Sequence, residues 1–210
     1  MPNGEKEAER MTQVVILDYG LGNLRSVKKG LEKAGAEAQI SSDLNVMASA
    51  DGVVLPGVGA FSEGMEKLEK MKSALYEYVK ERPVLGICLG MQMLLDVGEE
   101  YGVHEGLGLV PGAVKHFPSN PEFKIPHMGW NTIEITQKSP LFEGIENNSY
   151  VYFVHSYYAD TKPEYTLTKT DYVCSFASSI KNKNAYGTQF HPEKSGSTGL
   201  KILENFIGML

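Results

Sequence analysis

Short apolar runs that alternate with amphipathic segments fill the first part of the chain, and this alternation restricts the possible folds more than any other feature. The apolar runs are residues 14–17, 38–40, 53–55 and 84–87. Short runs that are apolar throughout are typical of parallel strands covered on both faces. Apolar residues recur at helical spacing in residues 24–34, 61–78 and 89–97. We therefore expect an α/β fold, with an open, mixed, largely parallel sheet and helices on both faces, as in flavodoxin-like proteins.

The second part of the chain carries shorter strand-like segments separated by turn residues. We expect strands at residues 107–110, 132–136, 150–154, 166–168, 173–177 and 185–190. An apolar stripe in residues 200–210 predicts a C-terminal helix. Because no repeat or linker marks a boundary, residues 11–210 are expected to form a single domain. Residues 1–10 are polar and are expected to be a loosely attached, disordered leader, with a short helix over residues 5–10 as the alternative.

The charge of the chain argues against a nucleic-acid or membrane partner. Its 210 residues carry a formal net charge of −6, and Lys and Arg are dispersed rather than clustered. No apolar run approaches the roughly 18 residues that a membrane span requires. The two cysteines lie in unlike contexts and the N-terminus lacks the apolar core of a signal peptide, so we expect a cytoplasmic protein with reduced thiols.

The segment Gly86-Ile87-Cys88-Leu89-Gly90 is the strongest chemical signal in the sequence. It joins a predicted strand directly to a predicted helix, which is the arrangement of a nucleophile elbow. The glycines leave room where the backbone doubles back. The helix N-terminus favours the reactive thiolate of Cys88, and the N–H of Leu89 is placed to bind an oxyanion. The alternative is a buried cysteine that packs as a small hydrophobe, which is the role expected for Cys174.

His191 and Glu193 are the candidate base and its orienting carboxylate. They belong to the triplet His191-Pro192-Glu193 at the end of a strand-like segment. In an extended chain, residues two apart point to the same side, so the carboxylate can fix the imidazole tautomer. Taken alone the triplet is more typical of a surface turn. Its combination with the cysteine elbow favours a catalytic role.

The elbow, the His-Pro-Glu triplet and the chain order Cys, His, Glu resemble those of the class I (triad) glutamine amidotransferases, from about residue 12 to the C-terminus. The resemblance implies that Cys88 attacks the side-chain amide of L-glutamine. His191 would act as general base and then as general acid, and Glu193 would orient it. Ammonia would leave, and water would then cleave a glutamyl thioester.

A glycine-rich segment after the third predicted strand is the candidate for the second oxyanion donor. Its glycines let backbone amides approach a ligand closely, so the N–H of Val58 or Gly59 is placed for this role. A plain strand-to-helix turn is the alternative. By resemblance to the same family, the expected substrate contacts are Gly57, Gln92, Ser156 and Tyr157.

Residues 18–23, 126–131 and 152–157 are similar to segments of the glutaminase subunits of imidazole glycerol phosphate synthase. This resemblance implies a heterodimer in which ammonia passes to the (β/α)₈ cyclase subunit of that synthase in histidine biosynthesis. Trp130 lies in a turn-like stretch and is expected to be an exposed interface anchor, with a half-buried core position as the alternative. The expected interface residues are Asn23, Met128, Trp130 and Tyr152. His127 and His155 are expected to be structural or interface residues.

Three other functions stay open at this point. The chain could serve another synthase, such as that of anthranilate or pyridoxal phosphate, and exchange of partner proteins would distinguish this case. It could be a partner-independent cysteine hydrolase, which would turn over alone. A non-catalytic scaffold is disfavoured because all three triad residues are present. No zinc-ligand spacing, phosphate-binding loop or dinucleotide fingerprint occurs, so neither a metal nor an organic cofactor is expected.

Overall fold

The computed structural model describes residues 10–210, so the expected leader and its alternative helix lie almost entirely outside the described residues. The first part of the chain alternates strand and helix, as the apolar pattern predicts. Its elements are β1 (Gln13–Leu17), α1 (Leu24–Lys33), β2 (Glu37–Ser41), α2 (Leu44–Ser49), β3 (Gly52–Leu55), α3 (Phe61–Glu81), β4 (Val84–Ile87) and α4 (Leu89–Met93).

The second part is built mostly from strands and ends in a helix. Its elements are β5 (Val97–Gly98), β6 (His104–Glu105), β7 (Ala113–His116), β8 (His127–Ile135), β9 (Ser149–His155), β10 (Tyr157–Asp160), β11 (Thr166–Asp171), β12 (Ser175–Asn182), β13 (Ala185–Thr188) and α5 (Gly196–Ile207). Short 3₁₀ turns occupy Pro140–Phe142, Pro163–Tyr165 and Pro192–Lys194.

One sheet connects all of these strands. Neighbouring strands follow the order β2-β1-β3-β4-β13-β12-β10-β7-β5-β6. The strands from β2 to β13 in this order are parallel, and antiparallel pairing begins between β13 and β12. The sheet branches at β12, which also pairs with β11 and leads through β8 to β9. The predicted open, largely parallel sheet is confirmed, while a single domain over residues 11–210 stays a prediction.

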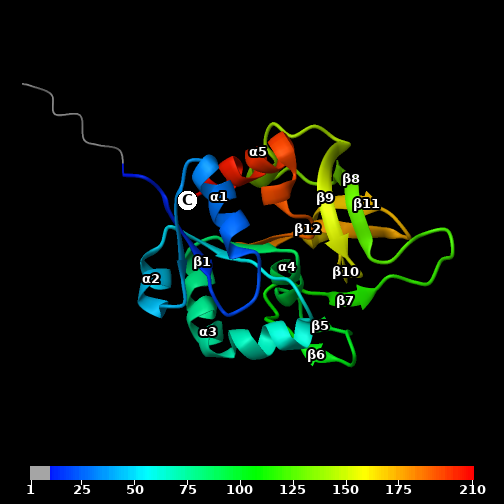
Figure 1. Ribbon diagram of the computed structural model, residues 1–210, viewed down its shortest axis with the longest axis horizontal. Helices are drawn as coiled ribbons and strands as arrows, with labels where there is room; N and C mark the ends of the chain where they lie inside the picture. The colour runs from blue at the N-terminus through cyan, green and yellow to red at the C-terminus, as the bar shows by residue number, and fades with distance from the viewer. Residues whose placement is uncertain (1–9) are drawn as a thin grey trace, which may run out of the picture.

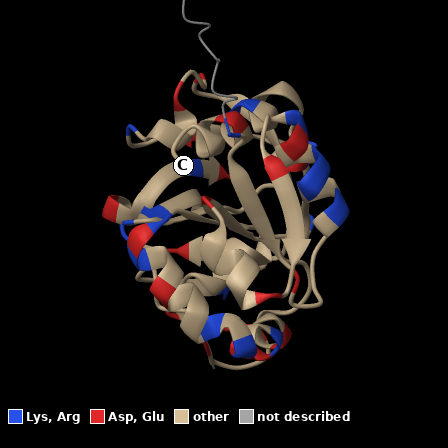
Figure 2. Ribbon diagram, turned by 90° about the vertical axis from the view of Figure 1, so that its left-hand side faces the viewer, with Lys and Arg blue, Asp and Glu red and all other residues tan. Residues whose placement is uncertain are grey.

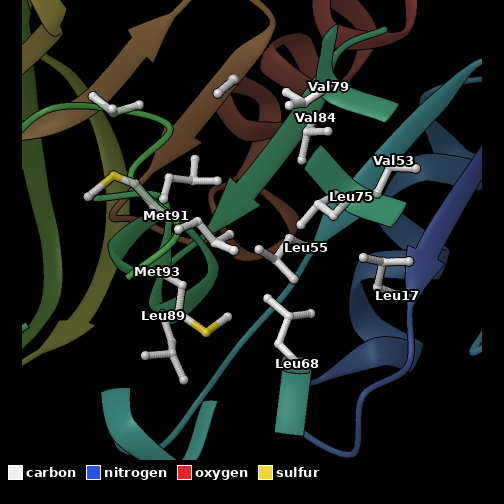
Figure 3. Packing of buried hydrophobic residues seen from close by; sticks show 14 of the residues in the cluster. Leu17, Val53, Leu55, Leu68, Leu75, Val79, Val84, Leu89, Met91 and Met93 are labelled. Carbon is white, nitrogen blue, oxygen red and sulfur yellow. The ribbon is translucent and has the colours of Figure 1, made fainter. Parts of the chain in front are cut away.

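Helices cover both faces of the parallel strands, with α1 and α5 on one side and α2 and α3 on the other (Figure 1). Successive side chains of a strand point to opposite faces. Val14 and Ile16 of β1 therefore belong to the apolar cluster that includes residues of α1 and α5, whereas Val15 and Leu17 belong to the other. Figure 3 shows the cluster that contains Leu17, where Leu68 of α3 packs near the strands. Each such fully buried side chain contributes about 1.5–3 kcal/mol.

Two predicted elements differ from the structure for one shared reason. Residues 107–110 form no strand, and the helix expected over residues 89–97 ends at Met93. The backbone N–H groups of Leu107 and Val110 donate to the carbonyl oxygens of Met93 and Leu94, at 2.8 and 2.9 Å. Because this loop satisfies the last carbonyls of α4, the helix stops there and Val97 joins β5 instead.

Other boundaries and short elements were also missed. The strand expected at residues 173–177 begins at Ser175, and the one expected at residues 185–190 ends at Thr188. Asn23 occupies the position before α1, but its side chain makes no capping hydrogen bond. The short elements α2, β7 and β10 have neither a continuous apolar run nor a sustained alternation, so no pattern in the sequence marks them.

Lys, Arg, Asp and Glu are spread along the ribbon with both signs interspersed (Figure 2). This distribution agrees with the dispersed Lys and Arg of the sequence. Within residues 10–210, none of the helices has the length and apolar character needed to cross a membrane.

Candidate active site

The chain reverses sharply at Cys88, between β4 and α4. The residue has φ 55° and ψ −110°, a conformation that a non-glycine residue rarely adopts. Hydrogen bonds on both sides hold it there: the Cys88 N–H donates to the carbonyl oxygen of Thr188 at 2.8 Å, and its carbonyl oxygen accepts from the N–H of Gln92 at 3.1 Å. The sheet and the helix together impose the strained turn, which places Cys88 at the carboxyl end of β4.

Glycines on both sides of Cys88 are required by close backbone packing. A Cβ at Gly90 would lie 1.8 Å from the carbonyl oxygen of Leu55 in β3, and a Cβ at Gly86 would lie 2.6 Å from the carbonyl oxygen of Gly90. No side chain fits at these distances. The two glycines therefore let the first turn of α4 lie directly on the sheet.

His191 and Glu193 form a buried pair across a 3₁₀ turn. His191 Nδ1 lies 2.8 Å from Glu193 Oε1, and the two side chains are 3% and 1% exposed. The pair is not at a strand end as expected, because β13 stops at Thr188 and Pro192 starts the turn. The carboxylate accepts from Nδ1–H, so Nε2 is left to exchange a proton.

The environment of His191 favours its protonated form. Burial disfavours the charge, but contact with Cys88 and the hydrogen bond to Glu193 outweigh burial and raise the pKa of His191 to about 9. The Nε2 atom itself is buried and has no partner in strict hydrogen-bonding geometry within residues 10–210. The sulfur of Cys88 therefore lies near the imidazole without a fully formed hydrogen bond.

Ser195 fixes the backbone beneath His191, a role that no motif of the sequence indicates. Its Oγ donates to the carbonyl oxygen of His191 at 2.6 Å and accepts from the N–H of Tyr152 at 2.9 Å. The N–H of His191 in turn donates to the carbonyl oxygen of Tyr152 at 2.9 Å. These hydrogen bonds hold the backbone of the His191–Ser195 turn against β9, a strand that is distant from it in sequence.

The loop after β3 lies against the elbow. A Cβ at Gly57 would lie 2.7 Å from the Tyr19 hydroxyl oxygen and 2.8 Å from Leu89 Cβ. The Tyr19 hydroxyl donates to the carbonyl oxygen of Pro56, which anchors the loop to the end of β1. Burial, followed by the charge of Cys88, raises the pKa of Tyr19, so this donor keeps its proton. No motif in the sequence indicates this role of Tyr19, which follows from its packing in the structure.

A cavity of about 430 Å³ opens above Cys88. It is lined by Val58, Gly59, Cys88, Leu89, Gln92, Glu100, Tyr101, His116, Pro126, Val154, His155, Ser156, Tyr157 and His191. The predicted nucleophile, base, oxyanion donors and most predicted substrate contacts therefore share one cavity. Gly57 is absent from the lining and packs behind it, where it sets the spacing between loop and elbow.

Two residues of this region were missed in the sequence. Glu100 brings a carboxylate to the cavity, and its Oε2 accepts from the N–H of Phe61 at 2.7 Å, at the start of α3. Gln189 is fully buried, with its Nε2 3.8 Å from Cys88 Sγ and its Oε1 accepting from Gln92 Nε2 at 3.0 Å. Gln189 reaches the site from a segment 101 residues from Cys88 in sequence, whereas Glu100 lies in the loop between β5 and β6.

The residues expected at a partner interface lie mostly on β8 and β9, and Trp130 is within strand β8 rather than in the turn-like stretch expected from the sequence. Met128 and Trp130 are 63% and 56% exposed, and the ring of Trp130 meets the ring of Tyr152 edge-on at 6.1 Å. The Lys194 ammonium lies 6.0 Å from the centre of the Tyr152 ring, so this surface adjoins the His191 turn. Asn23 is exposed at the start of α1. The core alternative for Trp130 is wrong.

A thiol, an imidazole and a carboxylate arranged in this order can form and hydrolyse a thioester. The thiol supplies the nucleophile, and Nε2 of His191 can carry a proton between the sulfur, a leaving amine and water. The second cysteine, Cys174, is half-buried elsewhere, and burial raises its thiol pKa, which makes it a poor nucleophile.

Comparison with known proteins agrees with this chemistry. The family model described as glutamine amidotransferase class-I matches residues 15–209. The chain is 54% identical over 202 residues to the imidazole glycerol phosphate synthase subunit HisH of Methanosarcina barkeri, with 95% of this chain and 100% of that protein covered. It is 46% identical over 198 residues to the subunit of the same name from Listeria monocytogenes, covering 92% and 94% of the two chains.

Solved structures of lower sequence identity share the fold. The structure of PurLQS from Thermotoga maritima superposes with a TM-score of 0.75 at 17% identity, over 95% of this chain and 99% of that one. A crystal structure of a glutamine amidotransferase superposes with a TM-score of 0.72 at 16% identity, over 92% of this chain and 98% of that one. At these identities the likeness concerns the fold alone.

Proposed function

The chain belongs to the glutamine amidotransferase class-I family, and from this premise we propose that it is the glutaminase subunit of an imidazole glycerol phosphate synthase. It hydrolyses L-glutamine to glutamate and ammonia, and the ammonia passes to a cyclase subunit in histidine biosynthesis. The observation that carries the proposal is the meeting of Cys88 with the buried His191–Glu193 pair at one cavity. Full-length similarity to proteins named HisH supports the choice of synthase. Both cysteines are unpaired, which suits the reducing cytoplasm.

The proposed reaction proceeds through a thioester. His191 Nε2 takes the proton of the Cys88 thiol, and the sulfur attacks the side-chain amide carbon of glutamine. The N–H of Leu89, with that of Val58 or Gly59, stabilises the oxyanion. His191 returns the proton to the departing nitrogen, which leaves as ammonia. It then takes a proton from water, which attacks the thioester carbon. The C–S bond breaks and glutamate leaves, and His191 returns the proton to the sulfur to restore the thiol.

The cavity has groups suited to the amino-acid end of glutamine. The carboxylate of Glu100 offers a partner for the α-ammonium group of the substrate. We assign Gln92, Ser156 and Tyr157 to the rest of the substrate, since all three line the same cavity. Gly57 contributes indirectly, through the packing of its loop against Leu89.

The exposed surface of β8 and β9 is the proposed docking site for the cyclase in a heterodimer. Met128 and Trp130 offer apolar area there, with Tyr152 beside them and Asn23 at the start of α1. An exposed aromatic anchor that becomes buried in the complex contributes about 2 kcal/mol or more to binding. Trp130→Ala should therefore weaken the complex by about 30-fold or more, measured by titration calorimetry.

The matched control for that experiment is Leu44→Ala. Leu44 is 40% exposed on α2, far from β8 in the fold (Figure 1). The control should leave the affinity unchanged. Equal affinities of the Trp130→Ala and wild-type chains would place the partner on another surface.

The experiment that tests the function measures glutamate release by the purified chain, with and without a histidine-pathway cyclase and its ligand. Cys88→Ala should abolish glutamine hydrolysis, while synthesis driven by added ammonium salts should survive, because the cyclase performs that step. Loss of both activities in the variant would contradict this division of labour. A rate of glutamate release that is the same with and without the cyclase would point to another synthase or to a partner-independent hydrolase.

A further inference from the structure

Four polar groups form a continuous line of hydrogen bonds through the interior beside the cavity. His155 Nδ1 lies 2.8 Å from the carbonyl oxygen of Tyr157. His155 Nε2 lies 3.0 Å from His127 Nδ1, and His127 Nε2 lies 3.3 Å from Asn131 Nδ2. Both imidazoles are buried, with 3% exposure for His127 and 5% for His155. The line runs from β10 through β9 to β8, and the catalytic steps proposed above do not use it.

The direction of every bond in this line follows from its two ends. A carbonyl oxygen only accepts, so His155 must carry its proton on Nδ1 and accept at Nε2. His127 must then donate from Nδ1 and accept at Nε2. At the far end, Asn131 Oδ1 accepts from the N–H of Thr132 at 2.8 Å, which leaves Nδ2 as the donor to His127. The two ends therefore require the same tautomer for both histidines.

The environment keeps both rings neutral, which this arrangement requires. Burial lowers the pKa of His127 to about 4 and that of His155 to about 3. The ring of His127 is held between Phe153 and Tyr172, with ring centres 4.7 and 4.0 Å away. The stacked rings restrict the rotation of His127, and the lowered pKa values keep both imidazoles from taking a second proton near neutral pH.

The inner end of the line meets the side chains around the nucleophile. The carbonyl oxygen of Tyr157 accepts from Gln92 Nε2 at 3.0 Å as well as from His155. Gln92 Nε2 also donates to Gln189 Oε1, and Gln189 Nε2 lies 3.8 Å from Cys88 Sγ. The position of the Tyr157 carbonyl thus determines where Gln92 lies in the cavity.

We propose that His155 and His127 are positioning residues, held in the Nδ1–H tautomer, that anchor the Tyr157 carbonyl and with it the Gln92 side chain of the glutamine cavity. That the cavity takes glutamine rests on the proposed function. The outer end of the line lies on β8, the strand that carries Trp130 on its exposed face. The ordering of the cavity is therefore tied to the strand proposed to meet the cyclase.

The tautomers can be measured without reference to activity. ¹⁵N chemical shifts of the full chain labelled at histidine distinguish the two neutral tautomers and the protonated form. Both His155 and His127 should be neutral and protonated on Nδ1 between pH 6 and 9, whereas a free imidazole protonates near pH 6.5. A proton on Nε2 of either ring, or protonation near pH 6.5, would overturn the proposal even if the chain proves to be a glutaminase.

The positioning role is tested by glutamine hydrolysis in the complex with the cyclase. His155→Phe keeps a ring but loses the donor, and should lower kcat/KM for glutamine by about tenfold. His155→Asn keeps a donor near the place of Nδ1 and should stay within about threefold of wild type. His104→Asn is the matched control, because His104 lies in β6 outside the line, and it should have no effect. Equal losses in the Phe and Asn variants of His155 would overturn the proposal.

A double variant separates positioning from loss of packing. His127→Phe should lower kcat/KM for glutamine by about fourfold. In this variant His155 keeps its hydrogen bond to the Tyr157 carbonyl but loses its hydrogen bond to His127. Because the two histidines act in series, His127→Phe combined with His155→Phe should be no worse than His155→Phe alone. If the losses of the two single variants multiply in the double variant, the histidines act independently and the proposal is overturned. Ammonium-driven synthesis should be unchanged in all of these variants. A wild-type chain without glutaminase activity would refute the proposed function, but it would not affect the tautomer result.

Discussion

Ser195→Ala removes one hydroxyl group that joins the base to the sheet. In the structure this hydroxyl donates to the carbonyl oxygen of His191 at 2.6 Å and accepts from the N–H of Tyr152 at 2.9 Å, and Ser195 is 2% exposed. The variant leaves both partners in place and deprives each of its bond. It therefore tests the anchoring of the catalytic turn without changing any group that would contact glutamine.

The size of the effect follows from these two buried bonds. A buried donor or acceptor left without a partner costs about 1–3 kcal/mol, so the pair should lower the free energy of unfolding by ~2–3 kcal/mol. For a chain of this length that corresponds to a fall in Tm of about 4–12 °C. The released turn should also misplace His191, which we expect to lower kcat for glutamine by about tenfold or more, with a smaller change in KM.

Scanning calorimetry of the chain and glutaminase assays with the cyclase would measure both effects. Ser49→Ala is the matched control, because its exposed hydroxyl donates to a carbonyl oxygen at 2.9 Å within α2 and contacts nothing in the site. It should change Tm by less than about 2 °C. If Ser195→Ala behaves like this control in both assays, His191 is held by other contacts and the reasoning fails.

Three further predictions concern the elbow and the base. Gly90→Ala brings a Cβ to 1.8 Å from a backbone oxygen of β3 and should cost about 3 kcal/mol or more in denaturant unfolding, whereas Gly208→Ala, with no contact closer than 3.4 Å, should be near neutral; equal stabilities would contradict the packing. Because the folded pKa of His191 is raised to about 9, its contribution to stability is full below pH 6.5 and is lost as the pH rises to about 9. Unfolding titrations across this range should show a shallower decline in Cys88→Ala, which lacks one of the two partners that raise the pKa, and parallel curves would argue against that contact. Glu193→Gln should retain at least about tenfold more glutaminase activity than Cys88→Ala, since the carboxylate only orients the base, and equal residual rates would refute this ranking.

Much of the fold could be predicted because its signals are local. The apolar run of β4 and the glycines around Cys88 lie within a few residues of one another, so strand, turn and helix could be placed together. His191 and Glu193 are two residues apart, and their proximity required only a local bend. The end of α4 could not be predicted in this way, because it depends on Leu107 and Val110 of a later loop, which donate to the carbonyl oxygens of Met93 and Leu94.

The α/β alternation, the elbow and the His-Pro-Glu triplet can all be predicted from the amino-acid sequence, because each depends on neighbouring residues. The other side chains that complete the site are brought there by contacts between distant segments. Ser195 meets Tyr152 across 43 residues, and Gln189 meets Gln92 across 97. Hydrogen bonds between such distant segments depend on sheet register and helix packing, and no periodicity in the sequence indicates which residues will meet. The directed line through His155 is of the same kind, since a tautomer is set by partners that folding alone brings together.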